Sequence, residues 1–309
     1  MQAGRMILGL DIGGTNFRMG LVGEDLQPHL IEVTSSRSLF EFSDPLAALA
    51  LRVKEYLAVT QHQFVPAMIC AGLPAVLDSS RRYVRSATNF PGMEGRNVVS
   101  YLENALGLPV MIEHDAYYLL AYDIMCRGLK NQGTMMGCYF GTGLGNAVFI
   151  NGQPYIGKNG VACELGHMPV PLSDIACSCG NFGCIEMYSC GKALERLAQE
   201  SFPNESISTL FVNHSNSDVL SNFIRYMAAA VATEVNILDP DYVFLGGGIV
   251  HMKSFPKEFF RQAILANTRK PFPAENLCLE FAKDSPENGI IGAAIEGFRK
   301  NSQTFIERR

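Results

Sequence analysis

A histidine and three cysteines stand close together near the middle of the chain. They are His167, Cys177, Cys179 and Cys184. Three thiolates and one imidazole are a closed tetrahedral donor set for zinc, and Gly180 and Gly183 permit the tight loop that such a set needs. Because four protein ligands leave no open position for water, we expect this metal to be structural. The alternatives are reactive or merely buried thiols, and Cys163 or Cys190 could replace one of the ligands.

Acidic side chains are candidates for proton transfer. Glu164 and Glu186 flank the cluster on either side, and a bound metal would fix their positions. Asp115 follows a predicted strand and precedes a predicted helix. A carboxylate at a strand end can accept a hydroxyl proton during phosphoryl transfer, which makes Asp115 a candidate general base. The alternative is that Asp115 is simply the N-cap of the helix.

Three glycine-rich segments follow apolar runs that predict strands. They are residues 11–16, 141–145 and 246–248. Glycines let backbone N–H groups approach an anion, and Thr15 and Asn16 add short polar side chains. Asp11, at the end of its strand, could hold a magnesium ion directly or through water. Each segment alone also suits an ordinary turn, but three such turns on strand ends can converge on one nucleotide; none matches the P-loop pattern.

Strands and helices are predicted to alternate around these segments. MILGLDI and FRMGLVG predict a β-hairpin, and MMGCYF and NAVFING predict a second one, which indicates an internal duplication. Helices are predicted to start at Ser43-Asp44-Pro45, to end at Asp239-Pro240 and to include IIGAAIEGFRK. YVFLGGGIV predicts a strand, a glycine turn and a continuation. This alternation is typical of an α/β fold.

Composition narrows the classes of function. The chain has 309 residues, of which 48% are hydrophobic and 18% charged, so it can bury a core and is not intrinsically disordered. Its formal net charge of -5 provides no broad positive field for nucleic acid or an anionic membrane, and we expect neither as a partner. The nine cysteines are not spaced as a disulfide framework and the N-terminus has no signal-peptide core, which favours a reducing cytoplasm.

The length suggests two domains, at about 150 residues per domain. No Ser- or Gly-rich linker separates the halves, so we expect a hinge crossed by helices near residues 115–121. The predicted small lobe comprises residues 1–118 and about 290–309, and the predicted larger lobe comprises residues 119–289.

Two motifs resemble those of a known family. The DIGGTN segment resembles the phosphate element of sugar kinases built on the actin-like ATPase fold, which is ribonuclease H-like. ELGH followed by CSCGNFGCIE resembles the signature of the ROK family of sugar kinases and sugar-responsive repressors. The resemblance extends from Gly9 to the C-terminal IIGAA. It implies a two-domain α/β fold around a nucleotide and sugar cleft, with a zinc knuckle and a homodimer surface in the larger domain.

The resemblance also implies roles for the candidate residues. Asp115 would be the base toward a hexose hydroxyl in an ATP-dependent kinase, with Mg-ATP as cofactor. The phosphates and magnesium would be held by Asp11, Gly13, Gly14, Thr15, Asn16, Gly141, Thr142, Gly143, Gly145 and Gly247. The hexose would contact Asn89, His114, Asp115, Glu164, His167 and Glu186. His167 would bind zinc through one ring nitrogen and the sugar through the other.

One position departs from the family pattern. Most members have asparagine immediately before the base, where its amide bonds sugar hydroxyls, whereas this chain has His114. Members that phosphorylate glucose keep the asparagine and those that phosphorylate D-allose do not; VNILDPDYVFLGGGIVHMKSFPKEF and RKPFP also resemble the latter. We therefore expect conversion of D-allose to D-allose 6-phosphate. The alternatives are a glucokinase, an N-acetylhexosamine kinase or a fructokinase; a sugar-responsive transcriptional regulator is disfavoured because only ten residues precede Asp11.

Overall fold

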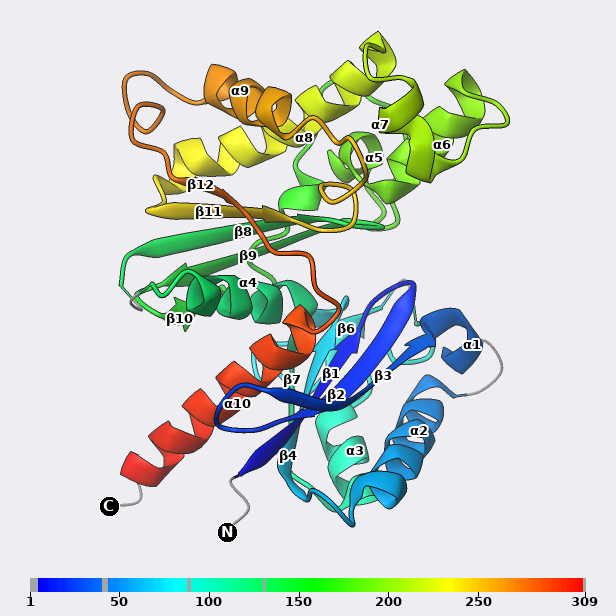
Figure 1. Cartoon of the computed structure of the whole chain (residues 1–309), viewed down its shortest axis with the longest axis vertical. Coiled ribbons are helices and arrows are strands. Elements are labelled where there is room, and N and C mark those ends of the chain that lie inside the picture. The colour runs from blue at the N-terminus through cyan, green and yellow to red at the C-terminus, as the bar shows by residue number, and fades with distance from the viewer. Residues whose placement is uncertain (1–4, 41–43, 88–89, 130–131, 308–309) are drawn as a thin grey trace. The chain divides into compact units, whose positions relative to one another are not determined.

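The chain forms two units of contacting residues and passes between them repeatedly (Figure 1). The structure, a computed structural model, describes residues 5–40, 44–87, 90–129 and 132–307. The first unit comprises Met1–Leu129, Ile156–Ala162 and Ser285–Arg309, and the second comprises Lys130–Tyr155 and Cys163–Asp284. The short segment Ile156–Ala162 therefore belongs to the first unit, although its neighbours in sequence on both sides belong to the second.

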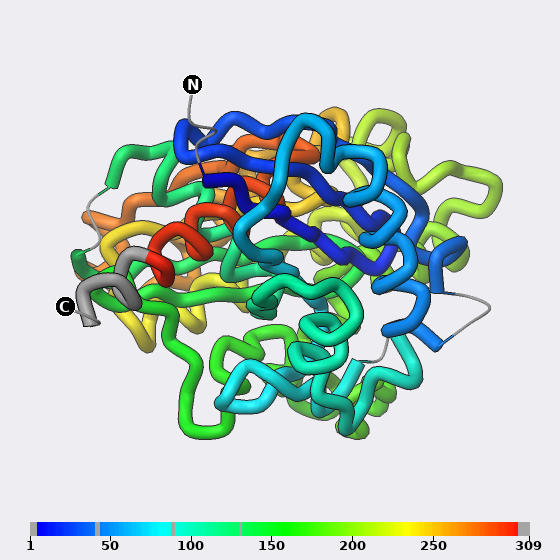
Figure 2. Tube along the Cα trace, turned by 90° about the horizontal axis from the view of Figure 1, so that it is seen from below, coloured from blue at the N-terminus to red at the C-terminus, as the bar shows by residue number. Residues whose placement is uncertain are grey.

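The first unit is built on a five-stranded sheet of order β3-β2-β1-β4-β7. Its strands are β1 (Met6–Ile12), β2 (Asn16–Val22), β3 (Pro28–Ser35), β4 (Pro66–Leu73) and β7 (Val110–His114). β1, β2 and β3 pair antiparallel, which confirms the first predicted hairpin, and Figure 2 shows them side by side in blue. β4 runs parallel to β1, and β7 runs parallel to β4, so the carboxyl ends of all three meet at one edge of the sheet.

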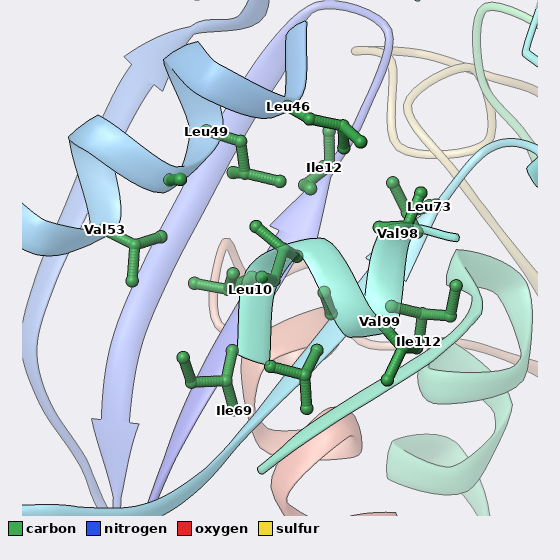
Figure 3. Close-up of a cluster of buried hydrophobic side chains, with 14 of the residues drawn as sticks. Leu10, Ile12, Leu46, Leu49, Val53, Ile69, Leu73, Val98, Val99 and Ile112 are labelled. Atoms are coloured by element: carbon green, nitrogen blue, oxygen red, sulfur yellow. The ribbon is translucent and has the colours of Figure 1, made fainter. Parts of the chain in front are cut away.

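Helices cover both faces of this sheet. They are α1 (Ser36–Phe40), α2 (Pro45–Thr60), α3 (Val98–Leu106), α4 (Asp115–Cys126) and α10 (Asn288–Glu307), and a small hairpin of β5 (Val76–Leu77) and β6 (Val84–Ser86) precedes α3. Leu10 and Ile12 of β1 pack with α2 and α3 in one buried cluster (Figure 3). Ile7 packs with Ile290 of α10 in another. Because strand side chains alternate between faces, Asp11 lies on the α10 side of the sheet.

The start of α2 is fixed by a side-chain cap, as the sequence predicted. The Asp44 carboxylate accepts hydrogen bonds from the backbone N–H groups of Leu46 and Ala47, and Pro45 is the first helical residue. Ser43, the other residue of the predicted start, lies outside the described residues.

The two units of contacting residues have other bounds than the predicted lobes, which stay a prediction. The first unit extends to Leu129 and resumes at Ile156–Ala162 and at Ser285, and residues 115–121 lie within it. The reason is packing across the chain: Tyr118 of α4 is buried in the same cluster as Ile290 of α10. The sequence shows no sign of this contact, because its two partners are far apart along the chain.

The second unit repeats the sheet of the first. Its strands are β8 (Thr134–Phe140), β9 (Leu144–Ile150), β10 (Gln153–Pro154), β11 (Tyr242–Gly246) and β12 (Leu279–Phe281). Their order is β10-β9-β8-β11-β12, with β8, β9 and β10 antiparallel and with β11 parallel to both β8 and β12. The second predicted hairpin is confirmed, and the likeness to the first unit extends over the whole five-stranded sheet.

Helices pack against this second sheet around its own core. They are α5 (Glu186–Ser189), α6 (Gly191–Ser201), α7 (Leu210–Asn213), α8 (Asp218–Leu238) and α9 (Lys257–Asn267), with 3₁₀ turns η1 (Leu165–His167) and η2 (Ile207–Thr209). β8 contributes Met136, Cys138 and Phe140 to this core. α8 ends at the left-handed C-cap Asp239, next to Pro240, which confirms its predicted end.

The predicted continuation of β11 after its glycines is wrong. The strand ends at Gly246, and residues 248–250 form a turn. The backbone N–H of Ile249 donates to the carbonyl of Phe140, at the end of β8, so the chain folds back over the sheet edge instead of extending. As for membrane segments, no helix within the described ranges is long and apolar enough to cross a bilayer.

Candidate functional site

Two carboxylates meet at the carboxyl edge of the first sheet. Asp11 stands near the end of β1, and Asp115 opens α4 directly after β7. Asp11 is paired across the hairpin with Arg18 of β2, and Arg18 Nη1 lies 3.0 Å from Asp11 Oδ2. The side chain of Asp11 is 13% exposed, so this ion pair is largely shielded from solvent.

The electrostatics of Asp11 reflect both neighbours. Burial raises its pKa to about 6, Arg18 opposes that rise, and the Asp115 carboxylate adds to it. The two carboxylates therefore lie close enough to repel each other. A divalent cation bound there would relieve the repulsion.

Asp115 is the first residue of α4, and the N-cap position belongs to His114. His114 Nδ1 accepts from the backbone N–H of Ala116 at 3.4 Å, and Asp115 Oδ1 accepts from the same N–H at 2.9 Å. His114 Nδ1 also lies 3.1 Å from Asp115 Oδ1. The two side chains thus share one backbone donor, which limits the orientations that the Asp115 carboxylate can adopt.

Hydrogen bonds from Ser36, the first residue of α1, restrain the turn between β1 and β2. Gly13 N–H donates to the carbonyl of Asn16, Ser36 Oγ–H donates to the carbonyl of Gly13, and Ser36 N–H donates to the carbonyl of Thr15. Gly14 and Thr15 at the tip are exposed. The turn therefore presents a restrained tip to solvent, as a phosphate-binding loop requires.

In the second unit, two of the predicted glycine turns lie together. Gly247 has a left-handed φ of 91°, and a Cβ there would lie 2.5 Å from the backbone N and O of Phe140, so only glycine fits. This places the 246–248 turn against the end of β8, where residues 141–145 begin. The N–H of Gly191, at the start of α6, donates to the carbonyl of Gly141 at 2.7 Å.

The predicted metal ligands form one cluster in the second unit. The ligand atoms of His167, Cys177, Cys179 and Cys184 all lie within 4.8 Å of one another. Cys177 Sγ is 3.6 Å from His167 Nδ1, and Cys179 Sγ is 3.6 Å from Cys184 Sγ. A tetrahedral zinc ion with Zn–S bonds of about 2.3 Å would place its ligand atoms about 3.6–3.8 Å apart. The spacing and the donor set therefore fit zinc.

Two of the three thiols of this cluster resist ionisation on their own, whereas burial at Cys179 is outweighed by hydrogen bonds from the Asn181 backbone N–H and the Cys184 thiol, which lower the pKa of Cys179. Burial and the neighbouring Cys179 and Cys177 thiols raise the pKa of Cys184 to about 12, and burial raises the pKa of Cys177. Three thiolates at this spacing would repel one another at neutral pH. A bound cation removes the repulsion, which is the second respect in which the cluster fits a metal.

The two ring nitrogens of His167 face different groups. Nδ1 faces the thiol cluster, whereas Nε2 lies 3.6 Å from Glu164 Oε2. Glu186 Oε1 lies 3.8 Å from His167 Nδ1 and accepts from Cys177 Sγ at 3.3 Å. A Cβ on Gly143 would lie 3.3 Å from Glu186 Oε2, so the acidic group also adjoins the glycine turn.

Asn89, which was predicted to contact sugar, lies outside the described residues.

Sequence reasoning missed two residues that shape these groups. Arg18 could have been identified, because the predicted hairpin places it opposite Asp11. Ser36 gave no signal, since its contacts with the turn between β1 and β2 depend on tertiary structure.

Comparisons with known proteins agree on one family. A family model described as the ROK family matches residues 7–296. The N-acetyl-D-glucosamine kinase of Vibrio cholerae is 28% identical over 310 residues, which cover 94% of this chain and 99% of that protein. The glucokinase of Thermotoga maritima is 27% identical over 265 residues, which cover 79% of this chain and 82% of that protein.

A solved structure supports the same assignment at the level of the fold. The ROK family glucokinase from Streptomyces griseus, in complex with glucose and AMPPNP, has a TM-score of 0.80 at 22% identity, covering 94% of this chain and 98% of that one. The predicted α/β fold is therefore confirmed. Because the family model matches nearly the whole length, the chain belongs to the ROK family.

Proposed function

We propose that this protein is a kinase that transfers the γ-phosphoryl group of ATP to the 6-hydroxyl of a hexose. The observation that carries the proposal is the juxtaposition of Asp11 and Asp115 beside a restrained glycine turn. Two similarities support the same reaction. The chain is similar to an N-acetyl-D-glucosamine kinase along nearly its whole length and to a glucokinase along most of it.

Asp115 is the proposed general base. Its carboxylate stands at the edge where three parallel strands end and is oriented by the N–H of Ala116 and by His114. It accepts the proton of the sugar hydroxyl as that oxygen attacks the γ-phosphorus, and the bond from phosphorus to the β,γ-bridging oxygen breaks to release ADP.

Asp11 is the proposed holder of magnesium, directly or through water. A magnesium ion bound there would neutralise charge on the phosphates of ATP. The backbone of the Gly13–Asn16 turn is proposed to hold phosphate oxygens, as are the glycines of residues 141–145 and Gly247. Arg18 keeps the carboxylate of Asp11 in place beside that turn.

Zinc is the proposed occupant of the cluster formed by His167 and the three cysteines. His167 would bind it through Nδ1, which would fix the ring and leave Nε2 for a sugar hydroxyl. Glu164 and Glu186 are proposed to accept hydrogen bonds from other hydroxyls, and Asn89 completes the proposed set of sugar contacts.

D-allose is the proposed substrate, and His114 is the reason. An imidazole in place of an amide changes which hydroxyl configuration is satisfied next to the base. N-acetyl-D-glucosamine and glucose are the competing substrates, because the relatives reported above are kinases of those sugars by name.

A coupled assay of ADP release tests the proposal. Magnesium-ATP is supplied with D-allose, glucose, mannose, fructose, N-acetylglucosamine or N-acetylmannosamine, and kcat/KM is compared. The proposal predicts turnover with hexoses and the highest kcat/KM for D-allose. A higher kcat/KM for N-acetylglucosamine or glucose would reassign the substrate, and the absence of turnover with every sugar would overturn the kinase itself.

A further inference from the structure

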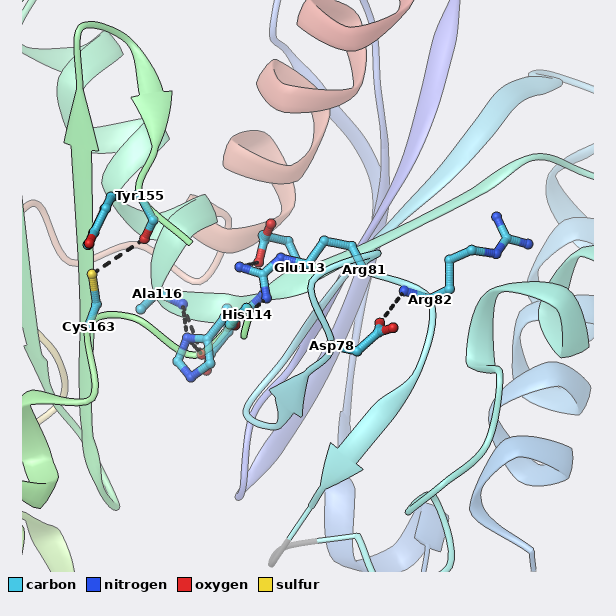
Figure 4. A network of polar contacts seen from close by, with 10 residues as sticks. Asp78, Arg81, Arg82, Glu113, His114, Ala116, Tyr155 and Cys163 are labelled. Carbon is cyan, nitrogen blue, oxygen red and sulfur yellow. Dashed lines mark hydrogen bonds and ion pairs between the residues drawn. The ribbon is translucent and has the colours of Figure 1, made fainter. Parts of the chain in front are cut away.

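Arg81 joins two parts of the first unit that are far apart in sequence. Its Nη2 lies 3.1 Å from Glu113 Oε1 (Figure 4). Its Nη1 donates to the carbonyl of Gly160 at 2.7 Å. The side chains of Arg81 and Glu113 are each 14% exposed. The guanidinium also lies 6.0 Å from the ring centroid of Tyr117 on α4. Arg81 is therefore held from three sides.

The backbone at Arg81 is strained, and the surrounding turn maintains that conformation. Arg81 has a φ of 54°, in the left-handed region that disfavours side chains larger than glycine. Its N–H donates to the carbonyl of Asp78, and the Asp78 carboxylate accepts from the N–H groups of Arg82 and Tyr83. Strain of this kind persists where neighbouring contacts hold a residue, as they do here.

Gly160 is pressed against the same turn. A Cβ at Gly160, which has a φ of 81°, would lie 2.7 Å from the carbonyl carbon of Asp78 and from the N of Ser79. The segment Ile156–Ala162 is a closed loop, since the N–H of Ala162 donates to the carbonyl of Ile156 at 3.1 Å. The loop is thus attached to the first unit near its tip, by a hydrogen bond and by backbone contact.

The chain itself connects this loop to the proposed sugar contacts. Four peptide units separate Gly160 from Glu164, so their Cα atoms can lie at most about 14 Å apart. At the other end of the contact, Glu113 is two residues before Asp115, and its Oε1 accepts from the N–H of His114 at 2.8 Å. Arg81 therefore connects Glu113, which lies two residues before the proposed base Asp115, with Gly160, which lies four residues before Glu164.

We propose that Arg81 is a positioning residue for sugar phosphorylation, which holds the 156–162 loop against the end of β7 beside His114 and Asp115, and so fixes the start of the segment that leads to Glu164. The inference rests on the proposed function. Arg81 touches neither the sugar nor the nucleotide in this account; it acts through Gly160 and Glu113. Loss of the contacts of Arg81 with Glu113 and Gly160 leaves ATP binding intact and makes the sugar-binding residues less rigidly positioned.

The test compares Arg81→Met with Gly160→Ala and with Arg82→Met as the matched control. Gly160→Ala displaces the loop by steric overlap without removing a charge, so it separates loop position from the burial of an unpaired Glu113. Arg82 is next in sequence, but its side chain is 42% exposed and pairs with Glu103 outside this contact. Double substitution Arg81→Met/Glu113→Gln removes both charges and keeps the comparison valid if Arg81→Met folds poorly.

Steady-state kinetics with sugar and ATP varied separately give the result. We expect Arg81→Met and Gly160→Ala to lower kcat/KM for the hexose about 10²-fold, with the KM for ATP unchanged and with weaker discrimination among hexoses. Arg82→Met should match the wild type. Wild-type kinetics for the hexose in both variants, or an equal loss for hexose and ATP, would overturn the role of Arg81.

Hydrogen exchange separates failure of this inference from failure of the proposed function. If the wild type phosphorylates no hexose, the proposed function fails, and the tie is then tested by exchange alone. We expect the amides of residues 156–162 to exchange faster in Arg81→Met than in the wild type or in Arg82→Met. Equal exchange in all three proteins would contradict the tie itself.

Discussion

The two sheets share one topology, yet their first hairpins carry different chemistry. In both, three antiparallel strands adjoin two parallel ones in the same order. We compare the cross-strand pair that lies one position before the last pair of each hairpin. It is Asp11 with Arg18 in the first sheet, and Tyr139 with Gly145 in the second. One copy of the hairpin therefore has a charge pair at its turn, and the other offers only backbone and uncharged side chains.

The charged side chain next to the second hairpin is Glu234 of α8, which packs against one face of the sheet instead of lying at the turn. Asn146 of β9 donates to Glu234 Oε2 of α8 at 2.7 Å, and Cys138 of β8 lies beside both. Burial raises the pKa of Glu234 to about 7. The two copies therefore keep the same hydrogen-bonded frame but differ in where their charge lies, at the turn in the first sheet and under the sheet in the second.

The largest expected effect belongs to the charged edge of the first unit. Asp115→Asn should lower kcat by about 10²–10⁴-fold, because an amide cannot take the hydroxyl proton. Hexose binding, measured by calorimetry, should be retained. Asp25→Asn, at an exposed turn of the same unit, is the control and should leave kcat unchanged. Turnover near the wild-type value in Asp115→Asn would remove this residue from the role of base.

The next largest effect belongs to the metal cluster of the second unit. Metal analysis should find about one zinc per chain, and Cys184→Ser should lose it and unfold at lower denaturant, since the binding energy of a structural zinc contributes to folding. The control is Cys278→Ser, because Cys278 is exposed and outside the cluster. A metal-free wild-type protein that folds and turns over normally would refute the zinc assignment.

A smaller effect is expected from the carboxyl group under the second hairpin. The folded-state pKa of Glu234 is about 7, above its ordinary value of 4.5, so the folded state binds the proton more tightly. The resulting stabilisation is complete below about pH 4.5 and is lost as the pH rises through about 7, which amounts to about 3 kcal/mol.

Glu234→Gln should remove this pH dependence. The free energy of unfolding of the variant, relative to that of the wild type, should therefore increase by about 2–3 kcal/mol between about pH 5 and about pH 8, because only the wild type loses stability over this range. Urea titrations at both pH values measure it, with Glu200→Gln on the exposed face of α6 as the control. The same pH slope for wild type and Glu234→Gln would show that Glu234 does not titrate in this range.

The smallest expected effect concerns specificity beside the base. His114→Asn should shift the ratio of kcat/KM for glucose over D-allose upward by about tenfold, because the amide pairs with a different hydroxyl configuration. The control is His62→Asn, at an exposed position after α2. An unchanged ratio in His114→Asn would show that His114 does not determine the substrate preference.

Local patterns predicted the elements of the structure well. Both hairpins, the capped start of α2, the end of α8 and the donor set of the metal cluster follow from residues close together in sequence, where glycine, proline and periodicity act directly. Features that depend on distant contacts were not predicted. The burial of α4 against α10 and the contact between Arg81 and Gly160 join segments that no local pattern connects.

The central claim is the transfer of a phosphoryl group from ATP to a hexose hydroxyl. Its most direct test is phosphorus and carbon NMR of the product formed from D-allose and magnesium-ATP. We expect a phosphate monoester on the 6-oxygen, with one ADP formed for each ester. ATP left intact, or ADP and inorganic phosphate without any sugar ester for D-allose, glucose or N-acetylglucosamine, would contradict it.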